Sequence, residues 1–145
     1  MDDVRYAKGR IAESIEYITE ELKEFDSDYA ARTWAEYQND RKLQKLMDRT
    51  VENVLIALIE VCGTILTREG TSAESYAAVM RKCANLLGFS QEEQDRFGKL
   101  AVQRNRLAHR YLNFRWHAIE SFKETRELLT RMLSLLLKRE GPEQG

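Results

Sequence analysis

Apolar residues recur at intervals of three and four along most of this chain, the spacing that places side chains on one face of an α-helix. The first such stretch predicts a helix from about Val4 to Phe25, with glutamates filling the opposite face. Its inward positions are Ile11, Ile15, Ile18, Leu22 and Phe25. Asp26-Ser27-Asp28 then predicts a break, and a shorter stretch that contains Trp34 and Tyr37 follows.

A long helix is predicted from about Asp40 to Arg68, because apolar residues form a continuous stripe along it. Between Val54 and Cys62 this helix is apolar on nearly every side. Such a segment has to be covered from more than one direction. It is therefore either the central helix of a bundle or a helix whose second face meets another chain.

Turn and capping residues divide the second half of the chain. Gly70 predicts the end of the long helix, because glycine is favoured just past a helix C-terminus. Thr71-Ser72-Ala73-Glu74 has the form of a capping box and predicts a third helix, which runs to about Leu87 before Gly88. Ser90-Gln91-Glu92-Glu93 is a second box of this form and predicts the start of a fourth helix.

A last helix is predicted from about Arg115 to Arg139, after a break near Leu112-Asn113. Its inward residues are Ile119, Phe122, Leu129, Leu133 and Leu136. The tail 140–145 is expected to be disordered. Residues 1–139 are therefore expected to form one all-α domain, an up-down bundle of four to five helices.

Composition supports a single helical domain. The 145 residues include one proline and seven glycines, which favours long helices over a sandwich or barrel. Cys62 and Cys83 stand in apolar contexts and form no C-x-x-C or metal-ligand pair, which favours a reduced, cytoplasmic protein. The charged N-terminus lacks the apolar region of a secretory signal. No apolar run approaches the roughly 18 residues of a membrane span, so no membrane association is expected.

Charge is distributed unevenly along the chain. The formal net charge is −1, but the span from Arg96 to Ile119 holds six basic residues, two histidines and no acid. A basic segment in an otherwise acidic chain is typical of binding to a phosphate-bearing ligand. The alternative is a solvated face that balances acidic helices elsewhere, and the absence of any acid in the span favours the ligand.

Several kinds of site are excluded. A di-iron centre in a helical bundle needs Glu-x-x-His pairs, but Arg106 and Phe114 stand three residues before His109 and His117. The chain contains no P-loop, no G-x-G-x-x-G and no G-x-S-x-G motif. Neither a metal nor a cofactor is therefore expected.

The segment from Arg104 to Tyr111 remains as the candidate site. Histidine exchanges protons near neutral pH, and the planar guanidinium of arginine suits a phosphate. His109 could handle the 2′-hydroxyl or the leaving oxygen of RNA while Arg104 stabilises the developing charge, with no metal ion. Arg106 and Arg110 could anchor flanking phosphates.

These residues carry a family resemblance. The chain resembles the HepT-type toxins of the HEPN superfamily, whose motif is R-x-x-x-x-H-x-Y, often with Asn directly after the Arg. Arg104, Asn105, His109 and Tyr111 match all of those positions. The segment 40–66, the pair Ser75-Tyr76 and the segment 100–109 continue the similarity, which covers roughly residues 1 to 138.

The resemblance implies a metal-independent endoribonuclease that forms a homodimer, with two copies of the motif facing each other across one cleft. It also implies a toxin–antitoxin system whose nucleotidyltransferase antitoxin neutralises the toxin by AMPylation. Carried over, Arg104 and His109 would be catalytic, Asn105 would orient them, and Tyr111 would receive the AMP.

The motif's spacing and one further position qualify this expectation. Residues five apart lie about 140° around a straight helix, so Arg104 and His109 share a face only if the helix ends between them or two copies meet. Glu60 matches an acidic position on the family's second helix, but Gly63 and Thr64 replace the Asn and His that often follow. Glu60 either lines the cleft as an accessory residue or is a partly exposed helix residue.

Other interpretations stay open. Tyr111 could be a core aromatic with its hydroxyl at the rim, and Trp34 and Trp116 are expected to anchor the core or an interface. His117 is expected to be ordinary packing or surface. The protein could also be a non-catalytic HEPN module that binds a nucleotidyltransferase or a nucleotide, or a structural helical adaptor.

Overall fold

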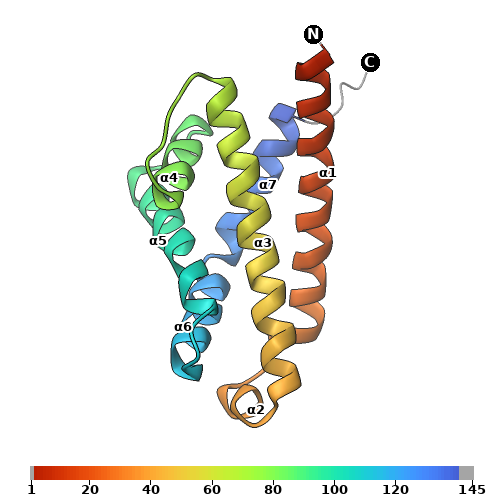
Figure 1. Cartoon of the computed structure of the whole chain (residues 1–145), viewed down its shortest axis with the longest axis vertical. Helices are drawn as coiled ribbons and strands as arrows, with labels where there is room; N and C mark the ends of the chain where they lie inside the picture. Colours follow the sequence, from red (N-terminus) through yellow and green to blue (C-terminus); the bar gives the residue numbers. More distant parts are fainter. Residues whose placement is uncertain (1, 141–145) are drawn as a thin grey trace.

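The computed structural model describes the backbone of residues 2–140 and the side chains of residues 9–140. Within that range every regular element is a helix, so the predicted all-α class is confirmed (Figure 1). The helices are α1 (Asp2–Glu24), the π-helix η1 (Phe25–Tyr29), α2 (Trp34–Asn39), α3 (Arg41–Arg68), α4 (Tyr76–Leu86), α5 (Gln91–Leu107), α6 (Leu112–Glu124) and α7 (Arg126–Glu140).

The bundle is built around α3. This helix packs against α1, α4, α5 and α6, and α7 closes the bundle against α1 (Figure 1). Four segments run alternately down and up the bundle: α1, α3, α5, and α6 followed by α7. Helix α4 lies beside α5 (Figure 1). The up-down arrangement is thus present, with α4 as an additional helix against α5.

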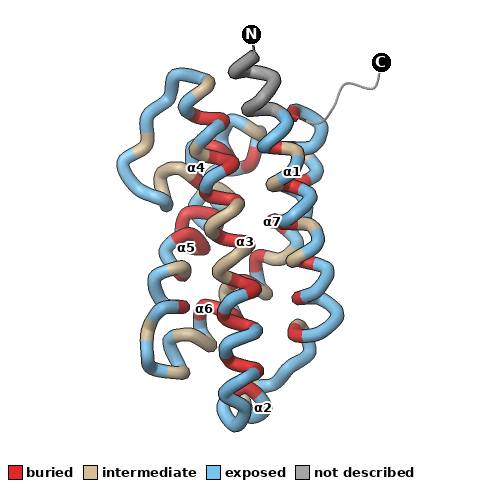
Figure 2. Tube along the Cα trace, turned by 45° about the vertical axis from the view of Figure 1, so that its right-hand side comes forward, coloured by how far each residue is buried: buried red, intermediate tan, exposed pale blue. Residues whose placement is uncertain are grey.

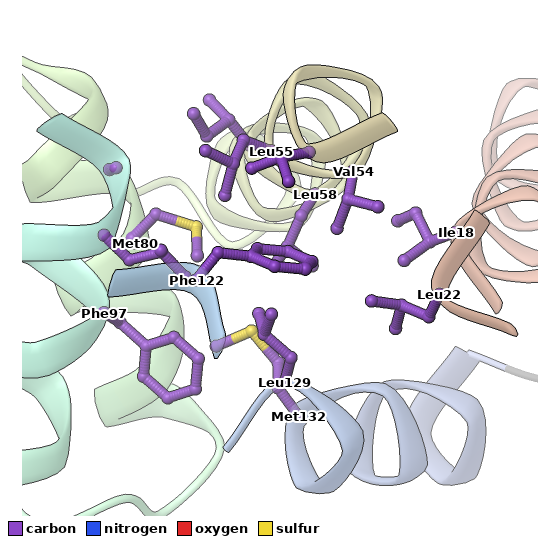
Figure 3. Packing of buried hydrophobic residues seen from close by; sticks show 14 of the residues in the cluster. Ile18, Leu22, Val54, Leu55, Leu58, Met80, Phe97, Phe122, Leu129 and Met132 are labelled. Carbon is purple, nitrogen blue, oxygen red and sulfur yellow. The ribbon is translucent and has the colours of Figure 1, made fainter. Parts of the chain in front are cut away.

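One hydrophobic core joins these helices. Its side chains come from every long helix, and Figure 3 shows a part of it, where residues of α1, α3, α4, α5, α6 and α7 point toward one another. Phe25 of η1 meets Phe122 of α6 edge to face, with ring centroids 4.8 Å apart. These contacts set the positions of α5 and α6, whose connecting turn carries the candidate site.

Burial along α3 settles how its apolar segment is covered. Of residues 54–62, only Ile56 and Ala57 are half-buried and only Glu60 is exposed, so helices of the same chain cover most of its surface (Figure 2). Arg41–Arg68 is also long and apolar enough to cross a membrane by length and composition alone, and 56% of the tested window is buried inside the protein. The core helix of a bundle has this same composition.

The predicted break at Asp26-Ser27-Asp28 is wrong. These residues form the wide turn of η1, in which the N–H of Ala30 donates to the carbonyl of Phe25 at 2.8 Å. This turn lets Phe25 and Tyr29 both face the core. Asp26 is paired with Arg126 of α7 at 2.7 Å, so its carboxylate ties two helices together instead of ending one.

The predicted capping box at Thr71–Glu74 is also wrong, because the end of α3 already uses the N–H of Thr71. Gly70, at φ +74°, donates to Thr67, and Thr71 donates to Leu66 at 2.8 Å. This pair of bonds is the Schellman motif. Helix α4 begins later, where Ser75 accepts from the N–H of Ala78.

The box at Ser90–Glu93 is confirmed. Here the Schellman motif of α4 ends on Phe89, whose N–H donates to Ala84, so the N–H of Ser90 is free for Glu93. Ser90 in turn accepts from the N–H of Glu93 at 3.2 Å. Each predicted box follows a glycine that ends a helix, but Thr71 directly follows Gly70, whereas Phe89 separates Ser90 from Gly88. This one-residue difference leaves the N–H of Ser90, and not that of Thr71, available for a capping box.

The last predicted helix is two helices. α6 begins at Leu112, three residues earlier than expected, and Thr125 separates it from α7. Thr125 is the C-cap residue of α6, and its N–H is shared between the carbonyls of Ser121 at 3.1 Å and Phe122 at 3.2 Å. At the other end, Glu140 is helical, buried and paired with Arg68, so the predicted tail begins one residue too early. The remaining tail, 141–145, lies outside the described residues.

Candidate active site

The motif residues lie on the last turn of α5 and on the short connection to α6. Arg104, Asn105 and Arg106 belong to α5, which ends at Leu107. The chain then turns, and the N–H of His109 donates to the carbonyl of Arg106 at 3.1 Å. The helix therefore ends between Arg104 and His109, so the two residues do not lie on one continuous helix.

The imidazole of His109 is held by its neighbours. Its Nδ1 accepts a hydrogen bond from the backbone N–H of Tyr111 at 3.2 Å. Because a neutral imidazole carries one proton, this bond assigns that proton to Nε2. Within the described part of the chain Nε2 makes no hydrogen bond of its own, so it is the nitrogen left for a ligand.

Tyr111 caps the N-terminal end of α6 and is not a core residue. Its side chain is 52% exposed, which overturns the alternative of a buried aromatic. The ring lies 4.9 Å from that of His109, and the guanidinium of Arg110 lies over it at 5.3 Å. The tyrosine is therefore accessible and has a positive charge beside it.

Arg104 points to a different neighbour. Its guanidinium is partly exposed and lies 5.2 Å from the ring centre of Tyr76, at the start of α4. Among residues 9–140, no hydrogen bond or ring contact joins Arg104 to His109. Asn105 and Arg106 are exposed and likewise make no side-chain hydrogen bond in that range, so the orienting role expected of Asn105 stays a prediction.

The basic span does not form one surface. Arg96 donates to the carbonyl of Glu124, and Arg115 is paired with Asp48 at 2.8 Å. Arg115 is therefore an internal structural cation. The charge left for a phosphate at the turn belongs to Arg104, Arg106 and Arg110.

A buried polar cluster links the beginning of α6 to α3 and α2. Asp48 of α3 accepts from the Tyr37 hydroxyl at 2.7 Å and from Arg115 of α6 at 2.8 Å. Burial raises the pKa of Asp48, while the bonds from Tyr37 and Arg115 oppose that rise. Burial and the Asp48 carboxylate likewise raise the pKa of Tyr37. The cluster joins α2, α3 and α6. The sequence analysis does not predict it, although the acidic residue beside the apolar stripe of α3 could have indicated it.

Aromatic residues complete that link. Trp34, Tyr37 and Trp116 pack together with ring centres 5.1 to 6.1 Å apart. The two tryptophans thus anchor the packing of α2 against α6, in agreement with the expectation. His117 is exposed on α6, also as expected.

Glu60 lies away from the turn. It is exposed and lines a groove of about 780 Å³ between α1 and α3, together with Arg10, Ser14 and Thr64 among others. All the residues that line this groove in the described part of the chain belong to those two helices. The structure therefore does not bring Glu60 together with the motif within one chain.

Neither a metal-binding cluster nor an accessible thiol is found among the described residues. Among the described residues, no group of three or more His, Cys, Asp and Glu side chains is arranged to hold a metal ion. Cys62 and Cys83 are both buried and free. The neighbouring Cys83 thiol and burial raise the pKa of Cys62, which keeps it protonated.

Comparison with known proteins gives one match. The family described as "Ribonuclease HepT-like" matches residues 11–129, most of the chain. Neither the curated proteins nor the solved structures include a significant match.

Proposed function

Because the chain belongs to the HepT-like ribonuclease family, whose substrate is RNA, we propose that it is a metal-independent endoribonuclease that cuts at the α5–α6 turn. The observation that carries this proposal is that the ring of His109 is held in one orientation. Its orientation is set by the Tyr111 N–H, its Nε2 is available, and Arg104, Arg106 and Arg110 lie within five residues of it.

The chemistry uses groups of the RNA itself. The 2′-hydroxyl attacks the adjacent phosphorus and releases its proton to water, and the bond to the 5′ oxygen breaks. His109 passes a proton from Nε2 to that leaving oxygen and takes one from water in its place. Arg104 stabilises the charge that develops on the phosphate oxygens. The products are a 2′,3′-cyclic phosphate and a 5′-hydroxyl.

We also propose that the complete site needs two copies of the chain. Arg104 contacts Tyr76 and has no bond to His109 in the described part of one chain, although the mechanism needs both groups at one phosphate. A two-fold axis that brings the turns of two copies together would pair them. The homodimer that the family resemblance implies supplies this axis.

The biological role that follows is that of a cytoplasmic toxin with a nucleotidyltransferase antitoxin, which transfers AMP to Tyr111. Exposure of Tyr111 supports this role, because a transferase can reach its hydroxyl. An added AMP would also place a bulky anion against His109 and Arg110 and so compete with RNA. The two free, buried cysteines are consistent with a reducing compartment.

Expression in a bacterial host without the antitoxin tests this function. The wild-type chain should arrest growth and cut cellular RNA, whereas His109→Ala should do neither while accumulating to the same level. His117→Ala is the matched control, because it removes the other histidine from an exposed position on α6, and it should still arrest growth. Wild-type protein of unmodified mass that leaves growth and RNA intact would overturn the proposal in favour of a non-catalytic binding module.

The modification is tested by intact mass after co-expression with the antitoxin. The mass should rise by one or more AMP units, and Tyr111→Phe should abolish the rise. Tyr76→Phe is the control, because Tyr76 is equally exposed but lies on α4. Neutralisation without any rise in mass would show that the antitoxin acts by binding alone.

A further inference from the structure

Phe114 is an aromatic residue of the turn that lies outside the R-x-x-x-x-H-x-Y motif. It stands on the first turn of α6 and keeps 41% of its surface exposed. Its ring centre lies 4.7 Å from that of His109 and 5.8 Å from that of Tyr111. Two aromatic rings, those of Tyr111 and Phe114, thus contact the imidazole to which the mechanism assigns proton transfer.

The geometry of these contacts leaves Phe114 available to a further ring. Its plane stands at 66° to that of His109 and at 84° to that of Tyr111, so both contacts are edge to face. Neither is a face-to-face stack. A buried phenylalanine would contribute more to folding than this one does, since much of its apolar surface stays in water.

The surroundings of Phe114 match one class of ligand. Arg104 is partly exposed, Arg106 and Arg110 are exposed, and no acid occurs from Arg96 to Ile119. Exposed aromatic rings set among arginines are the usual means of binding single-stranded nucleic acid, because rings stack bases and cations hold phosphates. A hydrophobic protein partner would not call for that concentration of positive charge.

We propose that Phe114 forms the platform on which the nucleobase next to the scissile phosphate stacks, with the ring of Tyr111 at its edge. The inference rests on the proposed ribonuclease activity and names its substrate class. Because a base has to leave its helix to stack on a protein ring, the site takes single-stranded RNA. Stacking also fixes the sugar that carries the attacking 2′-hydroxyl relative to His109.

The test uses short single-stranded RNAs in which only one nucleotide keeps its 2′-hydroxyl and is therefore the only cleavage site. In matched oligonucleotides, the base on either side of that bond is replaced by an abasic sugar. The wild-type protein should lose roughly 10-fold in kcat/KM when the stacked base is removed. Phe114→Leu, which keeps an apolar side chain but no ring, should lose as much on the intact RNA and nothing further on the abasic one.

The control variant is Leu137→Ala, which removes another exposed apolar side chain, on α7, and should behave as wild type on both RNAs. If Phe114→Leu lowered kcat/KM on the abasic RNA by the same factor as on the intact RNA, Phe114 would only support His109. Phe114→Leu protein that turns from dimer to monomer in light scattering would assign the ring to an interface between copies. Either result overturns the proposal.

Failure of the platform can be told from failure of the ribonuclease proposal. Binding is measured in parallel on fully 2′-O-methylated RNA, which cannot be cut, by fluorescence anisotropy. If the wild type cuts no RNA but still prefers the intact oligonucleotide through Phe114, the platform stands and the activity does not. Equal affinity of the wild type for intact and abasic oligonucleotides, with cleavage intact, would contradict the platform alone.

Discussion

The hydrogen bond from the Tyr111 N–H gives the imidazole of His109 one orientation before any RNA binds. A catalytic side chain that is already oriented loses less conformational freedom when the substrate arrives. This bond forms only because α5 ends at Leu107 and the chain turns within the next four residues. The short turn, and not a continuous helix face, is therefore what creates the site.

Replacement of Arg104 is predicted to lower kcat more than it changes KM. Arg104→Ala should lower kcat by about 10²- to 10³-fold with little change in KM, because its contribution is to the charge of the transition state. Arg104→Lys should recover only part of this loss, since an ammonium lacks the planar fork. Steady-state cleavage of a single-site RNA measures both constants.

Arg106→Ala is the matched control for that prediction. Arg106 stands two residues away and is exposed, so its loss should raise KM and flatten the dependence of binding on salt while kcat holds. If Arg104→Ala behaved in the same way, Arg104 would be a phosphate anchor and not a catalytic group.

The sequence identifies some of these residues better than others. Arg104 and His109 follow from the chemistry of their side chains, and the role of Tyr111 follows from the family resemblance. Phe114 and Asp48 belong to no motif, and Tyr76 forms part of the family resemblance without an assigned role. Their relevance depends on how the turn between α5 and α6 packs, which the spacing of residues along the chain does not specify.

Among the helices, periodicity predicts α1 and α3 well, because α1 buries one face and the apolar stripe of α3 is continuous. Their boundaries depend on single hydrogen bonds that periodicity does not detect. The N–H of Thr71 bonds to the end of α3, so it is not available for a capping box at Thr71. At α4 the corresponding bond comes from Phe89, which leaves the N–H of Ser90 available to cap α5. The break at Thr125 is one such boundary, since its N–H is shared between the carbonyls of Ser121 and Phe122.

The ion pair between Asp48 and Arg115 supplies a prediction about stability. Asp48→Ala leaves the half-buried guanidinium of Arg115 without its partner and frees the Tyr37 hydroxyl, so the free energy of unfolding should fall by about 3 kcal/mol. Urea unfolding followed by circular dichroism measures the change. Lys45→Ala, at an exposed position one turn earlier on α3, should change it little. Equal stabilities for the two variants would show that the Asp48 cluster does not hold α6.

The capping box of α5 supplies a pH prediction. The backbone N–H of Ser90 and the Arg131 side chain lower the pKa of Glu93 below its ordinary value of 4.5. A lowered carboxyl pKa in the folded state stabilises the fold above the unfolded pKa, and this contribution disappears as the pH falls through the folded value. The Tm advantage of the wild type over Glu93→Gln should therefore be present above about pH 5 and vanish in more acidic solution.

Glu92→Gln is the matched control, since it removes a like charge from the same turn without touching the bond to Ser90. Its Tm should depart less from the wild type at neutral pH. A Tm difference between wild type and Glu93→Gln that grows toward low pH would reverse the predicted sign.

For the whole molecule, the question is how Arg104 and His109 reach one phosphate. Each lies at the same end of the bundle, but they contact different neighbours, Tyr76 and Phe114, respectively. Two copies related by a two-fold axis would present four such groups along one RNA strand. A single chain would then supply half of each site.

Mixing two inactive variants tests this arrangement. If Arg104 of one copy works with His109 of the other, dimers of Arg104→Ala with His109→Ala contain one intact site. Exchange of subunits should restore about a quarter of the wild-type activity, since half of the dimers are mixed and each has one of its two sites intact. Activity no higher than the sum of the separate variants, with mixed dimers demonstrated by native mass spectrometry, would place the site within one chain.

Cleavage of RNA by His109 without a metal ion is the central claim of the proposed function. Purified protein incubated with end-labelled single-stranded RNA in excess EDTA should yield fragments ending in a 2′,3′-cyclic phosphate. His109→Ala should lower the rate by about 10²- to 10⁴-fold, and His117→Ala should leave it unchanged. Cleavage that stops on adding EDTA, or a folded His109→Ala protein that cuts at the wild-type rate, would contradict the account.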